Sequence, residues 1–312
     1  MTYQTFVQEV QNRLNQRQEQ GEGLYSAKAD MVTRLQDSYY GLVISAGVEW
    51  KVNLGLNLKD YYMEVVDSGL SLEEIVDRMD QVICHKIREM SGYDFSKLWD
   101  YGYVKDHLGL QVINQEKNRD RLKTIPYTPI ADLAVVYRIF PDEQSGALIN
   151  NGMLQKYGIS REQLHEDALA CARRKMPFMI RTIKEEMNVL LGKENSWKEE
   201  DGETAEVYFA STDGAYGASV IARPDFYEKA VQAAGEDFYI LPCSINEVLL
   251  VSSNKKGTVE DYENMVKEMN SMFVDEAEYL SDRLYHYDGR NQIFETAADY
   301  ERRIRNVPMM SM

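Results

Sequence analysis

Two apolar segments in the last third of the chain are joined by a connection that favours a hairpin. Phe238–Leu241 and Val248–Ser252 read as strands, and only the segment from Pro242 to Glu247 separates them. A parallel crossover needs about a dozen residues or more, so the two strands are expected to pair antiparallel. The sequence therefore predicts an α+β fold with mixed or mainly antiparallel sheets, flanked by amphipathic helices.

Amphipathic helices are predicted where apolar residues recur at helical spacing. Phe6, Val10 and Leu14 recur every four residues at the start of the chain and define one apolar face. Ser71 has a glutamate three positions later, which is the pattern of a capping box. Further helices are expected after Ser160 and Thr258, at Pro224–Ala234, and from Pro177 to Leu191.

Strands are expected from runs of β-branched and aromatic residues. They are Tyr39–Trp50, Leu110–Asn114, Asp132–Phe140, Ala147–Asn150 and Glu206–Ala210, with an edge strand at Ser281–Tyr287. The segment Lys193–Glu203 is polar and typical of a loop. Pro126 and Pro129 mark an internal boundary. We therefore expect an N-terminal α+β region, 1–125, and a C-terminal α+β region, 126–312, or one continuous domain.

The charge balance argues against several classes of function. The chain carries 35 basic and 51 acidic side chains, a net charge of −16, which disfavours a nucleic-acid partner. No stretch approaches the roughly 20 apolar residues that span a bilayer, and the first residues do not resemble a secretory signal. Cys84, Cys171 and Cys243 do not fit a disulfide framework or a CxxC metal site. A soluble cytoplasmic protein is therefore expected.

The densest group of ionisable side chains with catalytic potential is His165, Glu166 and Asp167. Consecutive helical positions are turned by about 100°, so the three side chains are not expected to meet at one point. A metal-binding helix prefers ligands four residues apart, and Leu169 breaks that pattern. We expect a structural His165, with the two carboxylates solvated or favouring the helix dipole.

The functional alternative assigns His165 the role of a general base or metal ligand. Its partners would be carboxylates from elsewhere in the fold, such as Asp132 or Asp282. Nothing in the sequence brings these three residues together, and no cofactor site is predicted.

Tyrosine is unusually frequent, with 21 residues and several close pairs such as Tyr39 and Tyr40 or Tyr61 and Tyr62. An exposed cluster of tyrosines could receive a protein or a ligand, because the side chain joins an apolar ring to a polar tip. The alternative is that the rings cover the core and are half-buried. The sequence leaves both interpretations open.

Several blocks in this order resemble a family of uncharacterised proteins from anaerobic gut Firmicutes, known as a domain of unknown function. They are NLGLNLKDYY at Asn53–Tyr62, DLAVVYRI at Asp132–Ile139, NNGMLQKYGISREQLHEDAL at Asn150–Leu169, FYILPCSINEVLLV at Phe238–Val251 and LSDRLYHYD at Leu280–Asp288. The GIS-x-x-x-LH-x-x-A pattern is more loosely similar to the YtpQ-like family of bacilli. The resemblance implies a bacterial cytoplasmic protein with one α+β fold, and it implies no reaction.

Three hypotheses about function follow. The first is a binding or regulatory protein without chemistry of its own, acting through contacts with a protein or a small ligand. The second is a hydrolase or metal-dependent enzyme that uses His165 with Asp132 or Asp282. The third and weakest is an acidic nucleic-acid mimic. The oligomeric state does not follow from the sequence.

Overall fold

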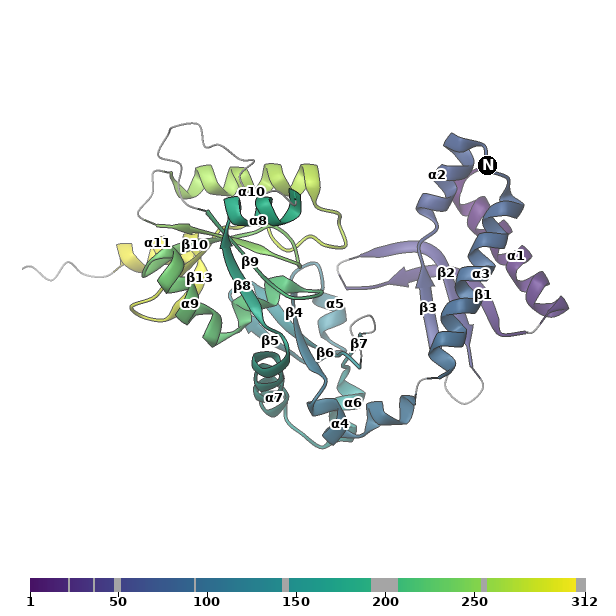
Figure 1. Cartoon of the computed structure of the whole chain (residues 1–312), viewed down its shortest axis with the longest axis horizontal. Coiled ribbons are helices and arrows are strands. Elements are labelled where there is room, and N and C mark those ends of the chain that lie inside the picture. The colour runs from purple at the N-terminus through teal and green to yellow at the C-terminus, as the bar shows by residue number, and fades with distance from the viewer. Residues whose placement is uncertain are drawn as a thin grey trace, which may run out of the picture. The chain divides into compact units, whose positions relative to one another are not determined.

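The computed structural model describes residues 1–21, 23–35, 37–47, 52–92, 94–141, 146–191, 207–253 and 257–306. It consists of two compact units, Met1–Lys97 and the part of the chain from Leu98 onward. Figure 1 shows both units with their helices and strands. Every strand pairing in the described residues is antiparallel, so the α+β prediction with mainly antiparallel sheets is confirmed.

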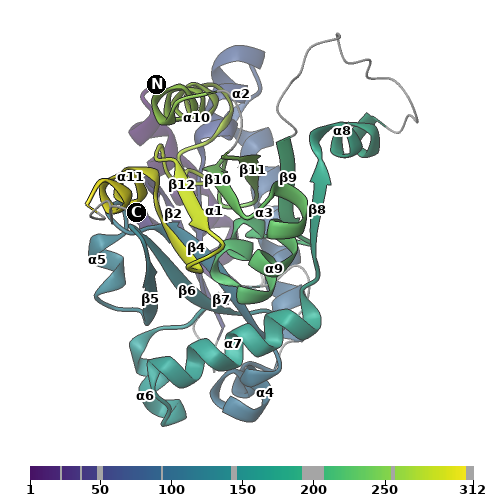
Figure 2. The ribbon, with the colours of Figure 1, turned by 90° about the vertical axis from the view of Figure 1, so that its left-hand side faces the viewer.

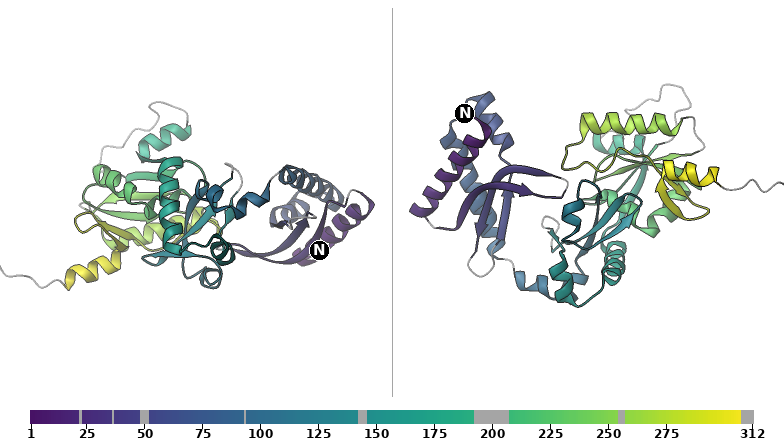
Figure 3. Two further views of the ribbon diagram at one scale, coloured as in Figure 1. Left: turned by 90° about the horizontal axis from the view of Figure 1, so that it is seen from below. Right: turned by 180° about the vertical axis from the view of Figure 1, so that it is seen from behind.

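The first unit is a three-stranded antiparallel sheet with helices packed on it. Its elements are α1 (Tyr3–Gln20), β1 (Tyr25–Thr33), β2 (Ser38–Ala46), β3 (Val52–Leu56), α2 (Lys59–Ser68) and α3 (Leu72–Ser91). The strand order is β1-β2-β3, which makes β1 and β3 the two edges. Figure 3 shows α1 lying along the strands of this unit.

The core of the first unit follows from the helical periodicity of its sequence. Phe6, Val10 and Leu14 are fully buried, and they pack with residues of β2 and α3 in one hydrophobic cluster. Ser71 and Glu74 form the expected capping box at the start of α3. Strand β2 ends at Ala46, and residues 48–50 of the expected strand lie outside the described part of the chain.

The second unit contains two antiparallel sheets that share one hydrophobic cluster. The smaller sheet consists of β4 (Leu108–Asn114), β5 (Tyr127–Ile130), β6 (Leu133–Ile139) and β7 (Ala147–Leu148). The larger sheet has the order β13-β12-β10-β11-β9-β8, from β8 (Phe178–Thr182), β9 (Val207–Thr212), β10 (Asp237–Pro242), β11 (Val248–Ser252), β12 (Tyr285–Asp288) and β13 (Ile293–Thr296). The predicted hairpin is confirmed as β10–β11.

Helices of the second unit surround these sheets. They are α4 (Tyr101–Lys105), α5 (Arg119–Leu122), α6 (Asn151–Tyr157), α7 (Arg161–Lys175), α8 (Ile183–Leu191), α9 (Pro224–Ala234), α10 (Val259–Phe273) and α11 (Ala297–Arg305), with a 3₁₀ turn at Gly217–Ala222. A further 3₁₀ turn, Phe95–Trp99, includes the last residues of the first unit and the first residues of the second. Helix α7 packs on β4, as Figure 2 shows. No helix in the described ranges is long and apolar enough to cross a bilayer.

The predicted helix from Pro177 to Leu191 is wrong in its first part. Phe178–Thr182 forms β8, which pairs with β9, and the helix begins only at Ile183. The local signal is a capping pair: the Thr182 hydroxyl accepts from the N–H of Glu185, whose carboxylate accepts from the N–H of Thr182. The hydrogen bonds between β8 and β9 outweigh the preference of Pro177 for the first turn of a helix.

Two further details differ from the sequence-based expectations. The expected boundary near residue 125 falls inside the second unit, because β4 before it pairs with β6 after it. Residues 285–288 form β12, which lies between β10 and β13 and is therefore not an edge strand. The loop expected at Lys193–Glu203 lies outside the described residues.

Candidate functional site

His165 lies on α7 and belongs to a short chain of hydrogen bonds. Its Nδ1 is 3.0 Å from the hydroxyl of Tyr137, which is 2.5 Å from the hydroxyl of Thr128. Burial lowers the pKa of the imidazole below 6.5 and raises that of Tyr137 to about 12. At neutral pH the arrangement is therefore an uncharged polar link between α7, β5 and β6.

The neighbours of His165 point elsewhere, as the helical spacing predicts. Glu166 is exposed. Asp167 is buried, where it accepts from the Tyr101 hydroxyl at 2.7 Å and pairs with the Lys105 ammonium at 2.8 Å. Burial opposes ionisation of Asp167, but these partners outweigh it and lower the pKa of the carboxyl. The expectation of a solvated Asp167 is thus wrong, and the residue ties α4 to α7.

Asp132 and Asp282 come together at a polar cleft of about 530 Å³ in the second unit. The cleft lies between the β4–α5 and β5–β6 connections and the segment before β12. Its described lining also contributes Arg119 and Arg283, together with the ring of Tyr279. Glu116 belongs to the lining as well and lies 3.8 Å from the Arg119 guanidinium, so the cleft holds three carboxylates and two guanidinium groups from separate parts of the sequence.

Asp132 and Asp282 are held in this cleft by specific contacts. Asp132 accepts from the Tyr285 hydroxyl at 2.8 Å and lies 3.3 Å from the Arg283 guanidinium. Ala131 precedes it with φ at +47°, a left-handed conformation that costs energy for any residue except glycine. Asp282 accepts from the buried Asn270 amide at 2.8 Å.

The structure does not join His165 to these carboxylates. Within the described residues, neither Asp132 nor Asp282 forms a hydrogen bond with the imidazole, and His165 does not line the cleft. The same ranges contain no group of three or more His, Cys, Asp or Glu side chains placed to hold a metal ion. In the described ranges the structure therefore brings Asp132 and Asp282 to one cleft and places His165 outside its lining.

The tyrosine pairs are mostly covers over the cores. Tyr40, Tyr61 and Tyr62 are half-buried and pack against the core of the first unit. Tyr101 covers the core of the second unit and donates to Asp167. The interpretation as half-buried covers therefore holds for these four residues.

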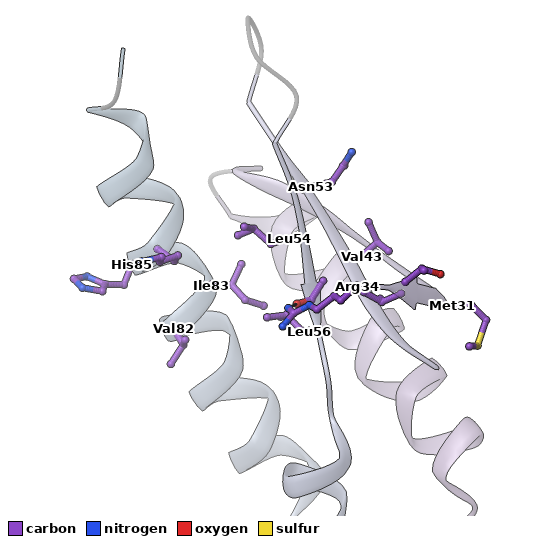
Figure 4. A pocket seen from close by; sticks show the side chains of 13 residues that line it. Met31, Arg34, Val43, Asn53, Leu54, Leu56, Val82, Ile83 and His85 are labelled. Atoms are coloured by element: carbon purple, nitrogen blue, oxygen red, sulfur yellow. Dashed lines mark hydrogen bonds between the residues drawn. The ribbon is translucent and has the colours of Figure 1, made fainter. Parts of the chain in front are cut away.

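A groove of about 740 Å³ lies in the first unit, beside β3 and α3. Figure 4 shows Ile83 pointing from α3 toward the strand that carries Leu54 and Leu56. Two apolar side chains in the groove are strongly exposed, Met31 at 56% and Val82 at 55%. The groove therefore combines a packed apolar floor with apolar side chains that remain in water.

The charged groups that line this groove are cationic. Arg34 and Lys86 belong to the lining, and no Asp or Glu is among its described residues. Glu89, one helical turn further on α3, pairs with Lys86 at 3.5 Å and with His85 at 3.3 Å. In a chain with a net charge of −16, the groove is locally basic.

The two edge strands of the sheet in this unit differ in the side chains that bond to their backbone. On β1, the Asn15 amide donates to the carbonyl of Ala27 at 2.9 Å, and its oxygen accepts from the same residue's N–H at 2.8 Å. Gln11 accepts from the N–H of Ala29 at 2.6 Å, and Gln18 accepts from the backbone just before the strand. Amide side chains of α1 thus occupy this edge as a neighbouring strand would.

Strand β3 has no comparable row of amides. In the described part of the chain, the side chain that bonds to its backbone is Arg34, which donates to the carbonyl of Gly55. An edge strand presents unpaired N–H and C=O groups to its surroundings. The groove runs along β3, so its wall includes backbone that can still accept a partner.

Sequence reasoning missed the groove, and the local signal that this unit offers concerns the opposite edge of the sheet. Gln11, Asn15 and Gln18 follow the i, i+4, i+7 spacing of one helical stripe beside the apolar stripe of α1. A row of amides beside an apolar face indicates that the helix borders a strand edge. The groove itself combines residues from three strands and α3, and no local pattern relates them.

These features define an α+β protein with a basic-rimmed apolar groove in one unit and a polar cleft in the other. The chain belongs to a family of unknown function, DUF5688, whose model matches residues 3–289. No curated protein and no solved structure matches the chain.

Proposed function

We propose that this protein is a non-catalytic binding protein that recognises a protein partner through the groove beside β3. The observation that carries the proposal is the exposure of Val82 and Met31 above a packed apolar floor. Burial of an apolar side chain away from water is favourable, by about 25 cal/mol per Å² of apolar surface buried. A groove with such side chains and few polar groups favours a partner that covers them.

The proposal also accounts for the separation of the catalytic candidates. His165 acts in it as a structural residue between α7 and Tyr137. A cytoplasmic location is part of the proposal, and the three free cysteines are consistent with a reducing compartment.

The test uses a phage-displayed library of random twelve-residue peptides, selected on the full chain. We expect peptides whose binding is lost in Val82→Glu, because the charge enters the apolar wall. Val66→Glu is the matched control: Val66 is 57% exposed on α2 and does not line the groove. Recovery of no peptide, or of peptides that bind both variants equally well, would contradict the proposal.

A small ligand in the polar cleft is a second candidate function, favoured by the opposite charges that line it. Asp132 and Asp282 suit an ammonium group, and Arg119 and Arg283 suit a carboxylate. The volume of about 530 Å³ falls in the range of small-molecule sites. The cleft therefore suits a small zwitterion such as an amino acid.

This second function can be tested by thermal unfolding with a panel of free L-amino acids at millimolar concentration. We expect Tm to rise with at least one amino acid and not with matched compounds that lack the amine or the carboxylate. Asp282→Asn should abolish the rise, whereas Asp275→Asn, an exposed residue outside the cleft lining, should retain it. An unchanged Tm across the panel would rule out this function.

A further inference from the structure

We infer that the partner enters the groove as an extended peptide segment and pairs with β3 as a fourth strand of the sheet. This inference rests on the proposed function and specifies its ligand. The segment would be apolar at alternate positions and would carry at least one acidic side chain.

The contrast between the two sheet edges supports strand addition. Side chains of α1 already bond to the backbone of β1 at Ala27 and Ala29, so this part of the edge has no room for another strand. Strand β3 pairs with β2 on one side, and the groove lies beside it. A helix could fill the groove, but its own backbone groups are already paired, so it would leave those of β3 unsatisfied. An added strand would cover the apolar floor of the groove and would also pair with the backbone N–H and C=O groups of β3.

The groove also fits the alternation of an extended chain. Successive side chains of a strand point to opposite faces, so one set would face Ile83 and Val82 on α3. The other set would lie on the face of the sheet that carries Val43, where the side chain of Val32 covers Gly55. Five residues of β3 offer a pairing length of about 17 Å.

The positive charge of the groove indicates that the partner carries an acidic side chain. Arg34 and Lys86 line the groove without an acidic residue among its described lining. An acidic side chain in the peptide would meet them with opposite charge. A second copy of this chain paired edge to edge through β3 would bring the same cations together, which disfavours that occupant.

The experiment takes the tightest peptide from the library and introduces a single backbone N-methyl group at each position in turn. N-methylation removes a hydrogen-bond donor and places a methyl group toward the pairing strand. In strand addition, alternate amides of the peptide point at β3. We expect methylation at those positions to weaken binding to the full chain at least about ten-fold. The intervening positions should change it much less.

A second measurement locates the pairing on the protein. Amide hydrogen exchange of the full chain should show new protection in β3 when the parent peptide is added, with no new protection in β1. Replacing the acidic residue of the peptide by its amide should weaken binding, and added salt should remove that difference.

The outcomes separate the inference from the proposed function. Peptides that require Val82 but tolerate N-methylation at every position would leave the groove as a binding site and would overturn strand addition. Protection that appears in β1 instead of β3 would overturn it as well. If no peptide depends on Val82, the proposed function itself fails. Dimerisation of the chain that is lost in Val82→Glu would identify a second copy as the occupant.

Discussion

Asn15 makes two hydrogen bonds to the backbone of Ala27, one through each end of its side-chain amide. The two residues lie on α1 and β1, so one side chain replaces a missing strand neighbour. This contact closes one edge of the three-stranded sheet and leaves β3 as the edge that is open to a partner.

Asn15→Ala should destabilise the first unit and expose its closed edge. Loss of two hydrogen bonds to partly buried backbone groups is expected to lower the free energy of unfolding by about 1–3 kcal/mol. Urea denaturation measures the change. Gln16→Ala, at an exposed position next to it on α1, should alter stability by less than about 0.5 kcal/mol. Equal effects of the two substitutions would contradict the role of Asn15.

Gly41→Ala should be strongly destabilising. A Cβ at Gly41 would lie 2.2 Å from the carbonyl oxygen of Leu56, so β2 or β3 would have to move. We expect a loss of more than about 2 kcal/mol in thermal or urea unfolding. Gly92→Ala is the control, because the nearest heavy atom to its Cβ is 3.7 Å away, an ordinary contact. A Gly41→Ala variant as stable as the parent would show that β2 and β3 can move apart at this point without a loss of stability.

His286 should make stability depend on pH below about 6.5. Its ring is fully buried and stacks on Tyr300 with the ring centroids 3.6 Å apart, and neither ring nitrogen has a hydrogen-bond partner within the described structure. Burial lowers the pKa of the imidazole below 6.5, in spite of nearby carboxylates such as Asp237 and Asp288. As the pH falls below 6.5, the unfolded chain takes up a proton that the native chain does not. The free energy of unfolding therefore decreases as the pH falls from 6.5 toward the pKa of the folded state, by at most about 1.4 kcal/mol per pH unit.

His286→Phe tests this account of the pH dependence. Phenylalanine keeps the stacking on Tyr300 and removes the two unpartnered nitrogens. The variant should be at least as stable as the parent at pH 7.5, and it should lose less stability between pH 6.5 and 5 in urea titrations. An unchanged pH profile in His286→Phe would assign the effect to other groups.

Tyr137→Phe should break the polar link that holds His165. The hydroxyl bridges Thr128 and the imidazole, so its removal leaves two partly buried groups without that partner. We expect a loss of about 1–3 kcal/mol in stability. Tyr127→Phe on the same sheet should cost less, since its hydroxyl forms no hydrogen bond to the described residues. A neutral Tyr137→Phe would argue against a structural role for His165.

Periodic and capping patterns predicted much of the fold. The four-residue repeat of Phe6, Val10 and Leu14 located α1 and its buried face, and the Ser71 capping box located the start of α3. The short connection between β10 and β11 predicted their antiparallel pairing. These features depend on residues close in sequence, for which helical geometry and loop length leave few alternatives.

The errors arose where distant strands competed with local preference. Pro177 favours the start of a helix, yet Phe178–Thr182 is stabilised more by hydrogen bonds to β9, which follows α8 in the sequence. Pro126 and Pro129 suggested a boundary, yet the chain on both sides pairs within one sheet. Long-range pairing leaves no local trace, so the sequence pattern indicated the wrong choice in both cases.

The sequence by itself determined the α+β class, the antiparallel hairpin, most of the helices and the divergence of His165, Glu166 and Asp167 around α7. Only the tertiary structure decided which residues meet. It brought Asp132 and Asp282 to one cleft, kept His165 bonded to Tyr137, and placed the amides of α1 along β1 while β3 stayed open. The physical reason is that a helix or a hairpin is specified by neighbours in the chain, whereas a cleft or a free edge depends on how separate elements pack.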